Sequence, residues 1–69
     1  MEYKDIDIDG VTFSLTIRKD YVGFLTWVYT AWLTNVKGII VQERRRKNIE
    51  ESIRTSYRVK KDYERNRKL

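Results

Sequence analysis

Residues 23–41, GFLTWVYTAWLTNVKGIIV, decide how this chain folds. They include both tryptophans, one of the two phenylalanines and a dense run of aliphatic side chains, with Lys37 as the single charge. Because the flanking sequence is strongly polar, the hydrophobic core must form around this stretch. A chain of 69 residues makes one domain, so we expect a single small domain over residues 1–69.

Within this stretch, residues 24–33 are predicted to form a strand that is apolar on both faces. Such a strand is usually covered on both sides, and a chain with one helix can cover only one of them. We therefore expect the other face to contact a partner, either a second copy of the chain in a homodimer or another protein. The residues assigned to this partner interface are Leu25, Trp27, Tyr29 and Trp32.

Residues 3–18 precede this strand and alternate between apolar and polar side chains, which predicts a β-hairpin with one buried face. Asp9 and Gly10 form a two-residue turn of the type that accepts positive φ angles. With that turn, Ile6 lies opposite Phe13, and both side chains fall on the apolar face of the sheet. Turn and pattern therefore predict the same register.

After the apolar segment we expect a fourth strand and then one helix. Asn48 is a good N-cap, and Glu51 completes a capping pattern at the start of the helix. The predicted fold class is α+β, with a three- or four-stranded antiparallel meander packed against one long C-terminal helix. The chain divides into a β-sheet over residues 1–44, a basic link over 45–47, a helix over 48–66 and a frayed tail over 67–69. The predicted core consists of Phe13, Leu15, Ile17, Val28, Ile39, Ile49, Ile53 and Tyr57.

The charge is distributed unevenly along the chain. Residues 1–20 contain five acidic and three basic side chains, a net of −2, whereas residues 21–69 contain twelve basic and five acidic ones, a net of +7. This pattern predicts a small non-enzymatic nucleic-acid-binding or regulatory module that contacts the phosphates of DNA or RNA. The alternatives are an ordinary solvated surface and a basic strip for an acidic protein partner. The predicted phosphate-contacting residues are Arg44, Arg45, Arg46, Lys47, Arg54, Arg58 and Lys61.

The absence of His and Cys from the sequence excludes disulfides and the usual zinc and haem ligands. No nucleophile–base pair and no glycine-rich phosphate loop can be assembled, so we expect no enzymatic activity, no catalytic residues and no cofactor. Asp5, Asp7 and Asp9 match the opening of a calcium-binding loop, but Thr16 stands where that loop needs glutamate. These aspartates are therefore interpreted as a charged edge strand, and no metal site is expected.

The N-terminal sequence MEYKDIDID lacks the apolar region of a signal peptide. Residues 21–36 are uncharged, but they fall short of the roughly 20 apolar residues of a spanning helix and are rich in strand-forming side chains. We therefore expect a cytoplasmic protein without a membrane partner.

From Phe13 onward the sequence resembles the HicB-like antitoxin family. The segments that carry the resemblance are FSLTIRKD at 13–20, GFLTWV at 23–28, GIIVQ at 38–42 and NIEESI at 48–53. The resemblance implies a small sheet-plus-helix fold related to a truncated RNase H-like domain, with a toxin protein as partner and no catalytic residues. The chain departs from the family in lacking proline and in its longer, more basic link before Asn48.

Overall fold

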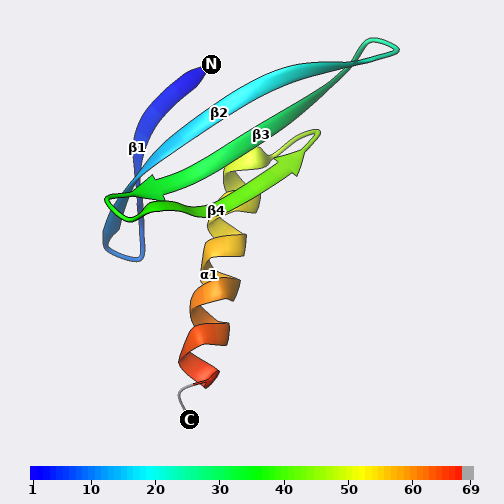
Figure 1. Cartoon of the computed structure of the whole chain (residues 1–69). Coiled ribbons are helices and arrows are strands. Elements are labelled where there is room, and N and C mark those ends of the chain that lie inside the picture. The colour runs from blue at the N-terminus through cyan, green and yellow to red at the C-terminus, as the bar shows by residue number, and fades with distance from the viewer. Residues whose placement is uncertain (68–69) are drawn as a thin grey trace.

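The computed structural model describes residues 1–67 and has the predicted α+β architecture. Four antiparallel strands form a meander in the order β1-β2-β3-β4, and one C-terminal helix packs against it (Figure 1). The elements are β1 (Glu2–Ile8), β2 (Val11–Gly23), β3 (Thr26–Asn35), β4 (Gly38–Arg45) and α1 (Ile49–Arg67).

The first hairpin has the predicted turn and register. Asp9 and Gly10 have φ angles of 53° and 85°, the left-handed pair that a two-residue hairpin turn requires. Ile6 pairs with Phe13 across β1 and β2, and both side chains are buried. The alternation of apolar and polar residues was therefore sufficient to fix which side of this hairpin faces the core.

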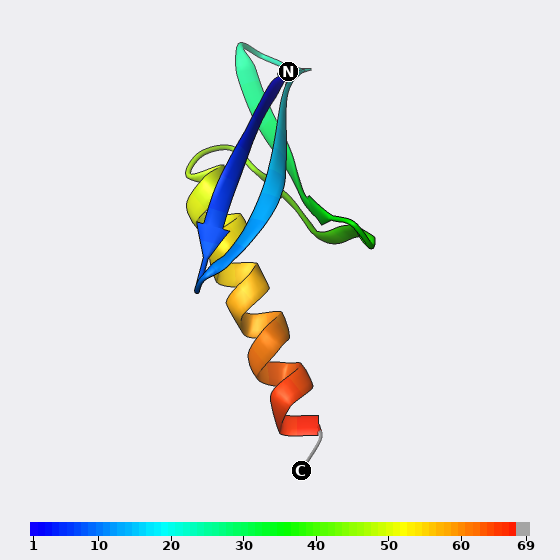
Figure 2. The same cartoon turned by 90° about the vertical axis from the view of Figure 1, so that its left-hand side faces the viewer.

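The core lies between one face of the sheet and the first half of α1, as the view in Figure 2 shows from the side. Ile53 of the helix is fully buried, as are Leu15 and Leu33 on the strands beneath it. The rings of Phe13 and Tyr57 meet edge-on with their centroids 4.8 Å apart. The buried apolar residues are Ile6, Ile8, Phe13, Leu15, Ile17, Ala31, Leu33, Ile49, Ile53 and Tyr57.

Two residues of the predicted core, Val28 and Ile39, lie elsewhere. The helix covers the face of β3 that carries Ala31 and Leu33, so Val28 lies on the opposite face and is only partly buried. Ile39 is 62% exposed, because the β3–β4 pairing shifts by one residue next to Leu33. This bulge changes which β4 side chains point toward the helix.

The second turn differs from the prediction. The predicted hairpin ended at residue 18 and the predicted third strand began at residue 24, which leaves residues 19–23 as the turn, but β2 continues to Gly23 and pairs with β3 as far as Thr26. The connection is a two-residue turn at Phe24 and Leu25, which the sequence analysis had placed inside the third strand. As a result, β2 and β3 project beyond the rest of the sheet as a two-stranded ribbon (Figure 1).

The helix begins at Ile49, directly after the predicted N-cap Asn48. The carbonyl of Asn48 accepts the first helical hydrogen bond from the amide of Ser52 at 3.0 Å. It continues to Arg67, one residue beyond the predicted end, and its second half projects past the sheet (Figure 1). The rest of the predicted frayed tail, residues 68–69, lies outside the described residues. Ribbon and helix together give an elongated molecule of 47 × 21 × 17 Å.

Candidate functional site

The helix cations that were predicted to contact phosphates are engaged within the chain. Arg54 donates to the backbone carbonyl of Asp7 at 2.8 Å, and Arg58 pairs with the carboxylate of Asp9 at 3.4 Å. Lys61 pairs with Glu64, one turn further along the helix, at 3.7 Å. The first two contacts join α1 to the β1–β2 turn, so these arginines position the helix on the sheet.

The acidic N-terminal segment and the basic C-terminal segment therefore meet across the helix–hairpin interface. Lys4 of β1 adds a contact of the opposite polarity, an ion pair with Glu50 in the first turn of α1. The hydrogen bond to this carboxylate raises the pKa of Lys4 above the usual 10.5. The pair consequently contributes at neutral pH and is lost only as the pH rises through the raised pKa.

The other predicted cations form the basic cluster, which comprises Arg44, Arg45, Arg46 and Lys47 at the end of β4 and the start of the link. Arg45 pairs with Glu43 at 2.7 Å. Within residues 1–67, Arg44, Arg46 and Lys47 form no ion pair, and all three are exposed. The structure thus divides the seven predicted residues into helix cations with local partners and a cluster with three charges that lack a carboxylate partner.

The face of the sheet opposite the helix places an aromatic ring beside this cluster. Thr16, Trp32 and Gln42 form one row of paired residues across β2, β3 and β4, and Arg18, Thr30 and Arg44 form the next row on the same face. We call these six residues the open-face patch. Successive rows on one face are spaced by roughly 7 Å along a strand.

Contacts within the open-face patch order its side chains. The guanidinium carbon of Arg18 lies 5.1 Å from the centre of the Trp32 ring, and its Nε donates to Asp20 at 2.9 Å. Thr30 is only 3% exposed, and its hydroxyl has no hydrogen-bond partner among the described residues. Trp32 remains partly exposed. The patch therefore combines a partly exposed tryptophan ring, an arginine that lies over it and a buried threonine hydroxyl.

The four residues assigned to a partner interface do not share one surface. Leu25 is at the tip of the ribbon, and Trp27 and Tyr29 lie on the side of the ribbon that faces the helix. Trp32 points to the opposite side, as its contact with Arg18 shows. A single interface through all four residues would need a partner on both faces of β3, so the predicted homodimer or protein partner stays a prediction.

Arg18 and Phe24 were not among the predicted site residues. Arg18 occupied an ordinary polar position in the alternating pattern of the second strand, and only the pairing of β2 with β3 brings it next to Trp32. Phe24 was read as a strand residue because aromatic side chains favour strands. The signal that could have identified it is the fact that Gly23 precedes two large apolar residues, which is a site where a tight turn can form.

Two aspartates of the first hairpin contact other residues of the chain. Asp7 accepts a hydrogen bond from the amide of Gly10 at 2.9 Å, and Asp9 pairs with Arg58. Among the described residues, acidic side chains do not gather in groups of three that would suit a metal ion.

The one described helix is not apolar enough over its length to cross a membrane. Comparisons with family models, curated proteins and solved structures gave no match. The resemblance to HicB-like antitoxins therefore stays a prediction.

Proposed function

We propose that this chain is a non-enzymatic module that binds single-stranded nucleic acid across its open-face patch. In this proposal a base stacks on Trp32 in place of the Arg18 guanidinium, which lies over the ring in the free chain, and Arg44, Arg46 and Lys47 contact the phosphates that follow. The observation that supports it is the position of Arg44, which has no carboxylate partner among the described residues and lies in the row next to Trp32 on the face that the helix leaves open. Arg46 and Lys47, which also form no ion pair there, follow Arg44 in the link.

A single strand suits this surface better than a duplex. Bases in a duplex are stacked on one another, whereas an unpaired base can leave its neighbours and lie flat on an exposed aromatic ring. The helix is a poor candidate for a groove-binding element, because Arg54 and Arg58 are turned toward the β1–β2 turn. Since stacking uses the π-face that all bases share, the proposal covers both DNA and RNA without base readout.

The two rows of the patch also fit the repeat of a nucleic-acid strand. Arg18 and Arg44 lie on the row next to Trp32, roughly 7 Å away along the strands. A base on Trp32 would therefore place its backbone close to a guanidinium group. The hydroxyl of Thr30, which has no hydrogen-bond partner among the described residues, is buried on this same row.

We expect the triple variant Arg44→Ser/Arg46→Ser/Lys47→Ser to bind a mixed-sequence single strand about a hundredfold more weakly at low salt, about 50 mM. Three phosphate contacts contribute roughly −2 to the slope of log K against log salt, and the variant should lose that contribution. Fluorescence anisotropy of a labelled oligonucleotide at several salt concentrations measures both quantities.

The matched control is Arg58→Ser/Lys61→Ser/Arg65→Ser, which removes the same charge from helix residues that have carboxylate partners. Its affinity is expected to fall by less than about fivefold, because only the long-range field of the protein changes. An equal loss in both variants would mean that binding follows net charge, and the proposed site would then be wrong.

The position of the base is tested by the emission of one tryptophan at a time. In a Trp27→Phe background, the remaining signal comes from Trp32, and stacking of a base should quench it. In a Trp32→Phe background, Trp27 should respond weakly, because it lies on the other face of β3. Quenching of Trp27 alone would contradict the assignment of the open-face patch.

A further inference from the structure

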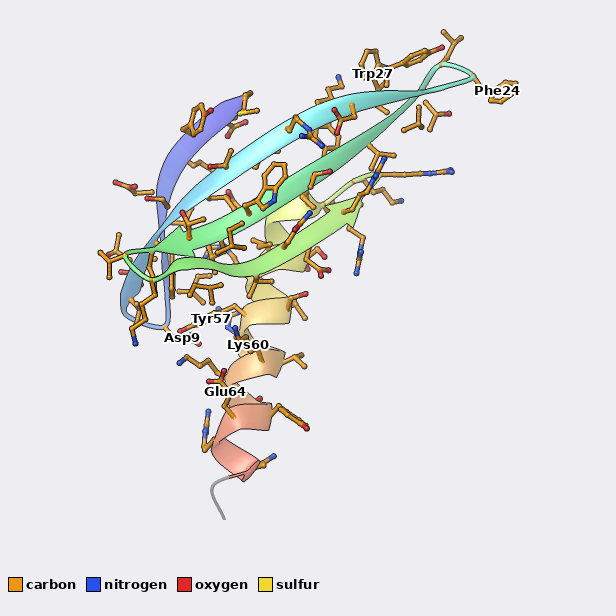
Figure 3. All side chains as sticks on the ribbon, in the orientation of Figure 1. Asp9, Phe24, Trp27, Tyr57, Lys60 and Glu64 are labelled. Carbon is orange, nitrogen blue, oxygen red and sulfur yellow. The ribbon has the colours of Figure 1, made fainter. Side chains whose placement is uncertain are left out.

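The tip of the β2–β3 ribbon exposes a cluster of apolar side chains, which we call the ribbon tip. Phe24 is 100% exposed and Leu25 is 89% exposed, and Figure 3 shows Phe24 pointing away from the rest of the molecule. Tyr21, Val22 and Trp27 just behind them are about half exposed. Single exposed apolar side chains are common, but a group of five at the projecting end of the ribbon marks a contact surface.

The ribbon tip is an ordered arrangement. The hydroxyl of Tyr21 accepts a hydrogen bond from the amide of Leu25 at 3.1 Å. The rings of Tyr21 and Trp27 lie 5.0 Å apart, and the ammonium group of Lys19 sits 4.7 Å from the Trp27 ring. The apex, Phe24 and Leu25, is thus supported by the rings of Tyr21 and Trp27, and Lys19 lies next along the ribbon.

The backbone of the turn has a conformation that is unfavourable for the two residues that occupy it. Phe24 and Leu25 have φ angles of 51° and 56°, in the left-handed region that Asn and Gly occupy at low cost in turns of this kind. A large side chain there adds strain, and such strain persists mainly where the residue serves a contact. Nothing in the described chain covers Phe24, so that contact is with another molecule.

The order of side chains along the ribbon matches the depth profile of a lipid bilayer surface. The apex is phenyl and aliphatic, the next level has the tyrosine and tryptophan that favour the lipid–water interface, and charges come last. Lys19 pairs with Tyr29, about four residues from the apex, which is roughly 13 Å along the strands. An apex buried by about 5–10 Å would therefore leave this lysine at the headgroups.

The basic cluster reinforces this match. Arg44 and Arg45 pair with Thr30 and Tyr29, so the end of β4 and the link lie at the base of the ribbon, on the side of the sheet from which it projects (Figure 1). Cations at this distance from the apex would face the phosphates of anionic lipids. We infer that the ribbon tip docks peripherally on an anionic lipid surface, without spanning it.

A nucleic-acid wedge and a second copy of the chain fit less well. Proteins that insert an apolar wedge between bases contact phosphates close to it, because the groove is only about 6–12 Å wide. Here the rows directly below the apex are Tyr21 with Trp27 and Asp20 with Val28, which supply a carboxylate and no cationic residue. The ammonium group of Lys19 reaches only to the Trp27 ring. In a dimer through this tip, two identical projecting surfaces would meet. They would not be complementary in shape, because neither has a groove that could receive the other.

The test is cosedimentation of the full chain with vesicles of neutral lipid and with vesicles that contain about 30% anionic lipid. The chain should partition onto the anionic vesicles, and Phe24→Asn/Leu25→Gly should reduce this by at least about tenfold. The control Val36→Ser/Val59→Ser also removes two exposed apolar side chains and should bind like the unmodified chain. In a Trp32→Phe background, the emission of Trp27 should shift to the blue on binding.

Equal binding of the tip and control variants, or no binding to anionic vesicles at low salt, would overturn the inference. So would a concentration-dependent dimer in sedimentation that the tip variant abolishes, because the occupant would then be a second copy. The inference shares the basic cluster with the proposed nucleic-acid function, but the ribbon tip has no part in that function. The tip variant leaves Trp32 and the basic cluster unchanged, so its affinity for single strands should not fall.

Discussion

Replacing Ile53 by alanine is expected to lower the free energy of unfolding by about 2–5 kcal/mol, the range for deleting a large buried aliphatic side chain. Ile53 is fully buried in the middle of the helix stripe that faces the sheet. The core of a domain of this size supplies only about 3–5 kcal/mol in total. The variant should therefore be largely unfolded at room temperature, as measured by urea titration with circular dichroism.

The effect should be this large because α1 is the only cover that the described chain provides for the sheet. If the helix detaches, Leu15 and Leu33 are exposed to water, and the contacts of Arg54 and Arg58 with the β1–β2 turn are lost. The exposed ion pair of Arg58 contributes little by itself, so hydrophobic packing at Ile53 must provide most of the attachment.

The control for this prediction is Val59→Ala on the same helix. Val59 is 62% exposed, so its truncation should change the free energy of unfolding by less than about 0.5 kcal/mol. A small effect of both substitutions would show that the sheet is stable without the helix. The core would then have to be assigned to contacts within the strands.

The first hairpin could be predicted from sequence because each local signal agreed with the others. The Asp9–Gly10 turn and the alternation around Ile6 and Phe13 specify one register, and the structure has that register. The stripe through Ile53 and Tyr57 likewise predicted which side of the helix is buried.

The third strand could not be placed as well, for a physical reason. Both of its faces are apolar, so periodicity does not decide whether Val28 or Ala31 faces the helix. That choice is made by the pairing of the strands and by the bulge next to Leu33. The turn at Phe24 and Leu25 was missed because neither residue belongs to the set that usually forms such turns.

The contacts between charged side chains also could not be predicted from sequence. Arg58 and Asp9 are separated by 49 positions in the sequence, and only the packing of the helix on the first hairpin brings them together. Sequence alone gave the two charged segments of opposite sign but not their contact. Of the seven predicted cations, Arg44, Arg46 and Lys47 are the ones without an ion pair among the described residues.

Replacing the turn residues by the pair that suits the turn, Phe24→Asn/Leu25→Gly, is expected to stabilise the fold by about 1–3 kcal/mol. Both φ angles lie in the left-handed region, which costs an ordinary residue roughly 1 kcal/mol or more. Asparagine and glycine adopt it readily, and Phe24 has no packing to lose because it is fully exposed. Urea titration measures the gain as a higher midpoint at unchanged slope.

The matched control is Phe24→Ala/Leu25→Ala, which removes the same apolar groups but keeps residues that resist a left-handed conformation. Its stability should stay within about 0.5 kcal/mol of the unmodified chain, so that the gain in the Asn-Gly variant reports backbone strain alone. A loss of stability in the Asn-Gly variant would instead mean that Phe24 and Leu25 pack against the folded chain.

Stability and vesicle binding, measured on the same turn variants, together separate the role of this turn in folding from its role in binding. If Phe24→Asn/Leu25→Gly raises stability and also abolishes vesicle binding, the native residues lower the stability of the fold but are needed for the contact with lipid. The alanine variant should lose vesicle binding without the gain in stability, since it lacks the apolar apex but retains the strain. The opposite outcome is vesicle binding that changes with the stability of the unmodified chain, the Asn-Gly variant and the alanine variant. Such a result would mean that the shape of the ribbon, and not the apolar side chains at positions 24 and 25, determines binding.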